Sequence, residues 1–441
     1  MHSYGGMMKY TIQRFSFESG ERYALLMNAQ TGVPLMHQNL YVTIHIRNTG
    51  NSINTMIACL GDLRLLDEIC EYLDIQLEQR FAEGKLLSKS EMESISYWTK
   101  KTKIALESAQ KGKKTRNVVA FRPNLKRLES SRHTVVIDTD LVNVMTTYNR
   151  LSNIISYTIW LAKTLTPTKE LKQLDKMETY FKTLRPTKQP SNNGANVFKS
   201  LTQSQIIRVL DIIRPDATDN PWNDLATRYR NQMIVNVLYD VGCRKGEVLT
   251  LKATEIEGGS YELKIRRNAD DPDDDRADQP LVKTLGRDVS VSKDVFEMVE
   301  NYIIKYRSQV KNSGKNPFLI LSHQNGAKTA KALSISGLKG MFETLSEAVG
   351  FTVGSHALRH TWNDEFSGDI EAAIEKGEIT EEEAEDTRSY LMGWKENSGT
   401  AKTYTKRYQQ KKSLRFALEL QEKRRSWVNN IVGQYDEDID I

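Results

Sequence analysis

The chain has 441 residues and lacks the features that define several protein classes. Its three cysteines are few and odd in number, which argues against a disulfide scaffold and for a reducing cytoplasm. No segment approaches the ~20 apolar residues of a membrane span, which excludes an integral membrane protein. The N-terminus, MHSYGGMMKYTIQRF, has no apolar stretch, so we expect no secretory signal. The histidines are scattered and form no Cys/His ligand cluster, which argues against zinc.

Charge is distributed unevenly along the chain, although the net charge is only +5. Residues 364–386 carry eleven acidic side chains against one lysine. Residues 100–132 carry eleven Lys or Arg, and residues 402–425 carry nine. Two basic tracts far apart in sequence are typical of a protein that binds a polyanion, but solvated surfaces are often rich in lysine too. The charge pattern alone therefore leaves both interpretations open.

Local patterns predict a mainly helical first half and an α+β second half. Residues 9–45 alternate and are rich in β formers, which predicts a small hairpin, and apolar residues then recur at helical spacing as far as residue 184. Residues 185–195, RPTKQPSNNGA, read as a linker. Beyond it we expect paired strands at 261–267 and 281–291, a helical hairpin insertion at 369–386 and a long helix at 405–428.

The sequence thus predicts five parts. They are a β-rich extension at 1–39, a helical domain at 40–185 with a basic insertion at about 107–137, a linker at 186–199, a mixed domain at 200–430 with an acidic insertion at about 369–386, and an acidic tail at 431–441.

Two short segments carry arginines in patterns suited to binding an anion. Arg244 lies in the glycine-flanked turn Gly-Cys-Arg-Lys-Gly-Glu that opens an apolar helix, where its planar fork can hold two phosphate oxygens. Glu247 is placed to orient that guanidinium, although a plain surface ion pair is the alternative. His356, Arg359 and His360 in His-Ala-Leu-Arg-His share one helix face. Two histidines at this spacing also fit zinc, which the arginine between them and the lack of a third ligand oppose.

Two further segments contain a lysine and a tyrosine that could take part in chemistry. Lys283, in Lys-Thr-Leu-Gly-Arg-Asp-Val-Ser, would approach an anion from a strand turn. Leu-Met-Gly-Trp394 is followed by Thr-Ala-Lys-Thr-Tyr404-Thr-Lys-Arg-Tyr408, where a tyrosine lies among basic residues and could act as a nucleophile. Taken singly, such a lysine means little and most tyrosines are packing residues.

In this order and spacing, the four segments resemble the tyrosine recombinase (phage integrase) family over residues 198–428. Residues 40–185 are similar, more loosely, to the helical core-binding domain of that family. The resemblance implies an α+β, mainly helical fold, with a SAM-like core-binding domain and a catalytic domain that holds a small antiparallel sheet. It also implies that the two domains close as a clamp around duplex DNA.

The resemblance implies a role for each matched residue. Arg244 and Arg359 would bind the scissile phosphate, Lys283 would protonate the departing 5′ oxygen, and His356 would assist proton transfer. Trp394 stands where most members have His and some have Trp, and it would donate a hydrogen bond. Tyr404 would form a 3′-phosphotyrosyl link, with Tyr408 as the alternative because ten positions rather than the usual nine separate Trp394 from Tyr404. Glu247 and His360 would support these side chains.

The resemblance also implies partners and excludes cofactors. Double-stranded DNA would be the substrate, a homotetramer would form on it, DNA-bending accessory proteins could assist, and neither a metal nor ATP would be needed. We expect DNA contacts from five basic residues of the helical domain, namely Lys111, Lys113, Lys114, Arg116 and Arg150. We also expect the C-terminal helix either to dock on a neighbouring subunit or to pack within its own chain. The chain would be a cytoplasmic, nucleoid-associated enzyme that integrates, excises or resolves a mobile element. The alternatives are an enzyme similar to type IB topoisomerases that relaxes supercoiled DNA, and a relative that binds DNA without catalysis.

Overall fold

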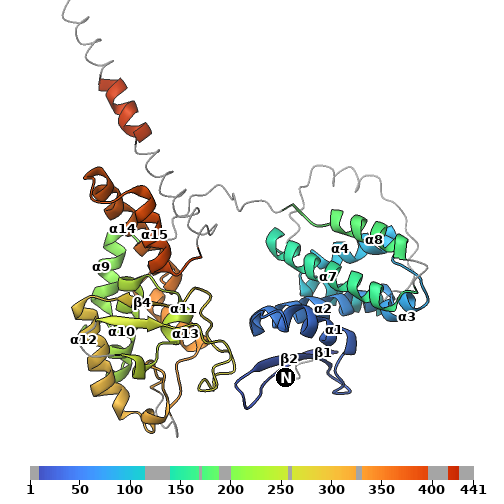
Figure 1. Ribbon diagram of the computed structural model, residues 1–441, viewed down its shortest axis with the longest axis horizontal. Helices are drawn as coiled ribbons and strands as arrows, with labels where there is room; N and C mark the ends of the chain where they lie inside the picture. The colour runs from blue at the N-terminus through green and yellow to red at the C-terminus, as the bar shows by residue number, and fades with distance from the viewer. Residues whose placement is uncertain are drawn as a thin grey trace, which may run out of the picture. The chain divides into compact units, whose positions relative to one another are not determined.

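The computed structural model describes residues 9–114, 140–167, 171–187, 200–256, 261–323, 330–395 and 416–426. The chain divides near residue 195 into two compact units (Figure 1). Helices dominate both units, and each contains one two-stranded antiparallel sheet, which confirms the predicted α+β, mainly helical fold. No helix within the described ranges is both long and apolar enough to cross a bilayer.

The first unit begins with the predicted hairpin and continues as a helical bundle. Strands β1 (Tyr10–Ser16) and β2 (Arg22–Asn28) are antiparallel, with Tyr10 opposite Asn28. The elements that follow are α1 (Met36–Val42), the π-helical turn η1 (Thr43–Arg47), α2 (Ile53–Leu73), α3 (Leu77–Ala82), α4 (Lys89–Thr99), α5 (Lys103–Lys114), α7 (Val144–Leu165) and α8 (Leu171–Thr183). Helices α2 and α7 lie at the centre of this bundle and share its buried apolar core.

Local sequence signals explain where these helices begin. The Ser52 hydroxyl accepts a hydrogen bond from the Thr55 backbone at the start of α2, and Ser88 and Glu91 form a reciprocal capping box at the start of α4. The β-rich extension expected at 1–39 is too long, because α1 already begins at Met36. The Asn39 carboxamide fixes α1 there by bonding both the backbone N–H and the carbonyl of Leu26 in β2.

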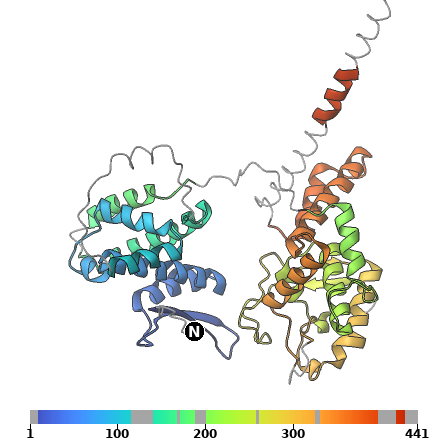
Figure 2. The same cartoon turned by 180° about the vertical axis from the view of Figure 1, so that it is seen from behind.

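The second unit surrounds its small sheet with helices. Its elements are α9 (Gln203–Ile212), α10 (Leu225–Val241), α11 (Lys245–Leu249), η3 (Ala253–Glu255), β3 (Glu262–Ile265), β4 (Arg287–Ser290), α12 (Lys293–Asn301), η4 (Tyr302–Tyr306), η5 (Arg307–Gln309), η6 (Ser313–Lys315), α13 (Ile335–Val349), α14 (Ser355–Glu375) and α15 (Glu381–Met392). Residues 416–426 form a further helix, all of whose side chains are exposed. The reverse view shows α14 and α15 running side by side (Figure 2).

The strands and the acidic insertion of this unit differ in extent from the expectation. The strands are shorter than the predicted 261–267 and 281–291, because Glu262–Ile265 pairs only with Arg287–Ser290. The acidic insertion at 369–386 forms the tip of a helical hairpin, as expected, but the two helices extend beyond it: α14 begins at Ser355 and ends at Glu375, and α15 begins at Glu381 and continues to Met392. Thr380 and Glu383 form a capping box that begins α15, so the insertion supplies the first half of that helix.

The acidic loop between the strands turns inward instead of extending into solvent. Arg276 forms a two-pronged ion pair with Asp274, and both side chains are buried. The same guanidinium donates to the backbone carbonyls of Leu249 and Leu333 at 3.1 and 2.8 Å. This bonding ties the loop that contains Lys283 to the end of α11 and to the segment that precedes α13.

We predict that Arg276→Met lowers the free energy of unfolding by about 3–5 kcal/mol, because it leaves the Asp274 carboxylate buried without its ion partner. The matched control is Arg266→Met, which removes the ion pair to Asp288 between two side chains that are over 40% exposed, at 45% and 43%. The control should cost at most about 1 kcal/mol. Urea unfolding of both variants measures the difference, and equal losses would contradict the inward-folded loop.

Candidate active site

The turn between α10 and α11 presents Arg244. Gly242 ends α10 in the left-handed conformation with φ +62°, where a Cβ would lie 2.7 Å from the Trp362 ring, so the position requires glycine. Arg244 is the N-cap of α11 and Glu247 lies one turn later. The Arg244 backbone N–H donates to Glu247 Oε2 at 3.0 Å, and Arg244 Nη1 donates to Glu247 Oε1 at 3.4 Å. The guanidinium is thus oriented by Glu247 while its side chain stays 27% exposed.

The Glu247 carboxylate is fully buried and links two segments that are distant in sequence. Besides Arg244, it accepts a hydrogen bond from the Thr284 hydroxyl at 2.7 Å and one from Arg287 Nη2 at 3.0 Å. Burial by itself raises the pKa of Glu247. The charge of Arg287, the Arg244 backbone N–H and the Thr284 hydroxyl outweigh it, so the pKa lies below its usual value. The carboxylate is therefore ionised at neutral pH.

The C-terminal end of α15 meets three arginines. Arg244 Nη1 and Arg359 Nη2 both reach the Met392 carbonyl oxygen at 3.5 Å, and Arg287 Nε donates to the Leu391 carbonyl at 2.7 Å. The last carbonyls of a helix lack partners within the helix and carry partial negative charge, so cations are favourable there. Because two guanidiniums share one oxygen, Arg244 and Arg359 lie close together. We call Arg244, Arg287, Arg359 and Glu247 the arginine cluster.

Arg359 is the most deeply buried member of the predicted anion-binding pair. It lies on α14, is 1% exposed, and Nη1 donates to the Gly242 carbonyl at 2.7 Å. Its guanidinium also lies over the Trp394 ring at 5.8 Å, and Trp394 is itself buried. The structure thus brings together Arg244, Glu247, Arg359 and Trp394. Arg359 is buried, whereas the Arg244 side chain is 27% exposed, and no hydrogen-bond partner of its Nε or Nη2 lies among the described residues.

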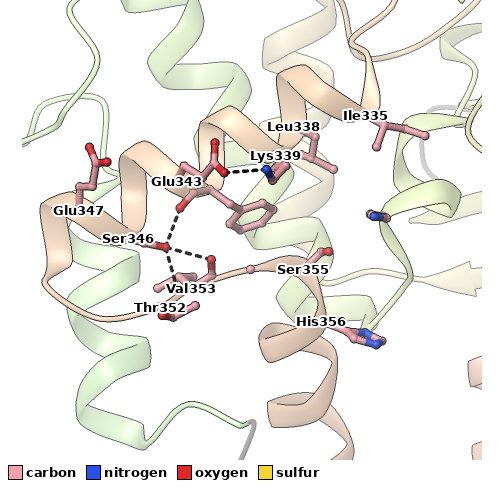
Figure 3. A pocket seen from close by; sticks show the side chains of 13 residues that line it. Ile335, Leu338, Lys339, Glu343, Ser346, Glu347, Thr352, Val353, Ser355 and His356 are labelled. Atoms are coloured by element: carbon pink, nitrogen blue, oxygen red, sulfur yellow. Dashed lines mark hydrogen bonds and ion pairs between the residues drawn. The ribbon is translucent and has the colours of Figure 1, made fainter. Parts of the chain in front are cut away.

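The two histidines lie on the first turns of α14. His356 is exposed, His360 is half-buried, and their ring centres are 5.2 Å apart. His356 also borders a cavity of about 520 Å³ between α13 and the start of α14, together with Lys339, Glu343 and Ser355 (Figure 3). His356 therefore lies on the accessible side of the site, one turn before the buried Arg359.

Lys283 lies in the long loop that joins the paired strands β3 and β4, near its C-terminal end. The strand expected from residue 281 begins only at Arg287, so Lys283 belongs to the loop that leads into β4. Its side chain is exposed, whereas its neighbour Thr284 is bonded to Glu247. This loop packs tightly on α11, since a Cβ at Gly246 would lie 2.5 Å from the Leu281 carbonyl oxygen. The backbone at Lys283 is therefore held next to the arginine cluster.

Several predicted residues lie outside what the structure describes or have structural contacts. Tyr404, Tyr408 and Arg116 fall outside the described residues, as do the side chains of Lys113 and Lys114. Lys111 is exposed on α5. Arg150 on α7 donates to the backbone carbonyls of Thr99 and Lys101, at 3.4 and 3.3 Å, and so holds α7 to the end of α4.

Sequence reasoning missed Arg287 and Thr284. The signal for Arg287 was present, because it lies on the same strand face as the buried Val289, where an unpaired charge is costly. A lone arginine on the inward face of a strand indicates a buried partner. The Leu391 and Met392 carbonyls carried no such signal, because every residue has a backbone carbonyl. No group of three or more His, Cys, Asp or Glu side chains within the described ranges is arranged to hold a metal ion.

Comparisons with known proteins bear on the second unit above all. Residues 199–367 match the model of the phage integrase family. No curated protein matches the chain. Among solved structures, XerH recombinase in a post-cleavage complex with a palindromic difH substrate is similar at 14% identity and a TM-score of 0.42, covering 83% of this chain and 89% of that one. A lambda integrase tetramer bound to a Holliday junction is similar at 12% identity and a TM-score of 0.34, covering 87% and 96%.

These structural scores are low, so the assignment depends on the family match. The matched region contains Arg244, Glu247, Lys283, His356 and Arg359 in the order that the sequence resemblance requires. It ends before Trp394 and Tyr404. Residues 199–367 of this chain belong to the phage integrase family, that is, to the tyrosine recombinases.

Proposed function

We propose that the chain is a site-specific tyrosine recombinase or integrase that cuts and rejoins duplex DNA through a 3′-phosphotyrosyl intermediate. The observation that carries the proposal is the convergence of Arg244 and Arg359, from distant segments, on one Met392 carbonyl oxygen. Two guanidiniums held side by side can neutralise one phosphodiester and stabilise the additional charge of its pentavalent transition state. Duplex DNA is the substrate that offers such a group.

The phosphate would bind on the exposed side of Arg244. Its Nη1 is engaged by Glu247 and Met392, so Nε and Nη2 are directed to a ligand. Arg359 is buried and anchored to the Gly242 carbonyl, so it contributes charge from a fixed position. Such preorganised cations cost little rearrangement when the negative charge develops, which is the usual source of a large rate enhancement.

In the cleavage step the Tyr404 phenol oxygen attacks phosphorus, and the bond from phosphorus to the 5′ oxygen breaks. The exposed Lys283 gives its proton to the departing 5′ oxygen, and His356 assists removal of the phenol proton. Trp394 packs beside Arg359 at the phosphate. Ligation is the reverse attack by a 5′ hydroxyl. The phosphotyrosyl link keeps the energy of the broken bond, so the cycle requires neither ATP nor a metal.

Two tyrosines could supply the nucleophile. Tyr404 follows Trp394 by ten residues and Tyr408 by fourteen, and an extended chain spans about 3.3–3.6 Å per residue. Both phenols can therefore reach the arginine cluster from Trp394, so the length of the connecting chain does not show which tyrosine is the nucleophile. We assign Tyr404 because Thr-Ala-Lys-Thr-Tyr-Thr fits the motif of the family better.

The remaining assignments concern partners. We propose that a tetramer assembles on two DNA sites and that Lys111, Lys113, Lys114 and Arg116 contact phosphates through the basic tract that contains them. Arg150 is withdrawn from this set, because its guanidinium binds backbone carbonyls. Strand exchange between two sites, as opposed to relaxation alone, distinguishes a recombinase from a type IB topoisomerase-like enzyme.

We predict that Tyr404→Phe binds DNA but forms no covalent adduct, because phenylalanine has no oxygen to attack phosphorus. The probe is a pool of supercoiled plasmids with randomised inserts, from which covalent protein–DNA complexes are recovered in SDS. Tyr408→Phe is the matched control and should form the adduct. Loss of the adduct in Tyr408→Phe alone would move the nucleophile to Tyr408. Absence of any adduct with the unaltered chain would contradict the proposed function.

We also predict that Arg244→Ala lowers the rate of adduct formation about 10²–10³-fold, because it removes one charged donor from the transition state. Arg214→Ala is the matched control: Arg214 lies in the same unit, its side chain is 55% exposed, and it pairs only with exposed carboxylates. The control rate should be unchanged, and thermal unfolding checks that both variants fold. An equal rate for Arg244→Ala and the control would contradict a role for Arg244 at the phosphate.

A further inference from the structure

We propose that Arg287 is a positioning residue of the active site: it fixes Glu247 and the end of α15, and so keeps the charges of Arg244 and Arg359 directed to the DNA phosphate. The inference rests on the proposed function and deepens it. Arg287 lies in the same segment as Lys283, but the resemblance assigns it no role, and it reaches the phosphate-binding arginines only through other groups.

The contacts of Arg287 join three segments at one guanidinium. Nη2 donates to Glu247 Oε2 at 3.0 Å, Nε donates to the Leu391 carbonyl at 2.7 Å, and Nη1 lies 3.3 Å from the Thr284 hydroxyl. The side chains of Arg287 and Glu247 are 1% and 0% exposed. Each of the three nitrogens therefore has a partner, and the guanidinium has no face open to DNA.

The packing around this guanidinium leaves it little room to move. A Cβ at Gly393 would lie 2.5 Å from Arg287 Nη1, and the Gly393 carbonyl accepts a hydrogen bond from the Leu285 backbone N–H at 3.0 Å. Gly393 has φ +62°, a conformation that other residues adopt only with strain. The glycine before Trp394 thus lets the end of α15 close directly onto Arg287.

The charges explain why a third arginine is needed. Glu247 is a buried anion, and without Arg287 its nearest cation would be Arg244. An ion pair of Glu247 with Arg244 alone would consume the charge that has to meet the phosphate. With Arg287 present, Glu247 and Arg287 form a buried neutral pair, and the two positive charges of Arg244 and Arg359 remain for the substrate. Breaking a buried pair from one side leaves an uncompensated charge, which the protein relieves by taking up a proton or by moving a neighbour.

The titration of Glu247 gives this role a signature that simple packing lacks. The groups that face the carboxylate are Arg244 and Cys243 near α11, Thr284 and Arg287 at β4, and Arg359 on α14. Burial raises the pKa of Glu247, and Arg287 provides the largest opposing charge. Removal of Arg287 therefore raises this pKa. Because the ionised carboxylate orients Arg244, activity in such a variant should begin to fall at a higher pH as the solution is acidified.

The test compares Arg287→Met with Arg307→Met. Arg307 is a buried arginine of the same unit, and among the described residues its guanidinium donates only to backbone carbonyls, those of Phe318, Ser313 and Asn316. The measurement is the rate of covalent adduct formation on the randomised plasmid pool as a function of pH. We expect Arg287→Met to lower the plateau rate, reached at the pH values where the rate no longer changes, roughly 10–100-fold, as is typical when an outer partner of a charged site is lost. We also expect its acid limb, the part of the profile in which the rate falls on acidification, to move to higher pH. Arg307→Met should leave the acid limb unchanged.

A double-mutant cycle shows whether Arg287 acts through Glu247. In a Glu247→Gln background, which cannot lose a carboxylate proton, Arg287→Met should have a smaller effect and no shifted acid limb. Arg287→Lys keeps the charge but cannot reach Glu247 and Leu391 together, so it should lower the plateau and keep the wild-type acid limb. If Arg287→Met does not fold, the plateau rate of Arg287→Lys tests whether Arg287 positions the site.

Three results would overturn the inference while leaving the proposed function intact, provided that the unaltered chain forms the adduct. The first is an acid limb for Arg287→Met that coincides with that of the unaltered chain. The second is full additivity of Arg287→Met and Glu247→Gln. The third is an Arg287→Lys plateau equal to that of the unaltered chain. If the unaltered chain forms no adduct, the proposed function itself fails.

Discussion

The proposed active site depends on one buried carboxylate. Glu247 has no exposed surface, and hydrogen bonds reach it from the turn after α10, from the loop before β4 and from the first residue of β4. A buried anion is stable only when it is paired and hydrogen-bonded. The segments that supply its partners must therefore pack around the carboxylate in the folded state. The same requirement that stabilises this part of the fold therefore brings together the arginines that we propose to bind the phosphate.

The end of α15 is the second element of that assembly. Its last carbonyls accept hydrogen bonds from Arg244, Arg287 and Arg359, which gives the negative end of the helix the cations it favours. The acidic insertion supplies the first half of this helix and begins it with a capping box. An insertion that looks like a solvated charge run in sequence thus contributes, through its far end, to the geometry of the site. The segment that follows leads through Trp394 toward Tyr404.

The sequence was sufficient to predict the features that residue type and spacing carry. The first hairpin, the mainly helical α+β fold and the family of residues 199–367 are confirmed. The strand lengths were not predictable, because the loop from 266 to 286 is held by Arg276 and not by strand pairing. The extent of α14 was not predicted either, because this helix continues from Ser355 into the acidic insertion as far as Glu375. The carbonyls of Leu391 and Met392 could not be identified from the sequence, because every residue has a backbone carbonyl. The role of Arg287 was missed for the same reason, since this arginine binds the Leu391 carbonyl.

The central claim is that Arg244 and Arg359 bind the same phosphate. A crystal structure of the Tyr404→Phe variant, bound to a duplex recovered from the randomised pool, would test it most directly. The account predicts that both guanidiniums lie within hydrogen-bond distance of one backbone phosphate, with Glu247 still bonded to Arg244 and Arg287. A structure in which the two arginines contact different phosphates, or in which the cluster lies away from the DNA, would contradict it.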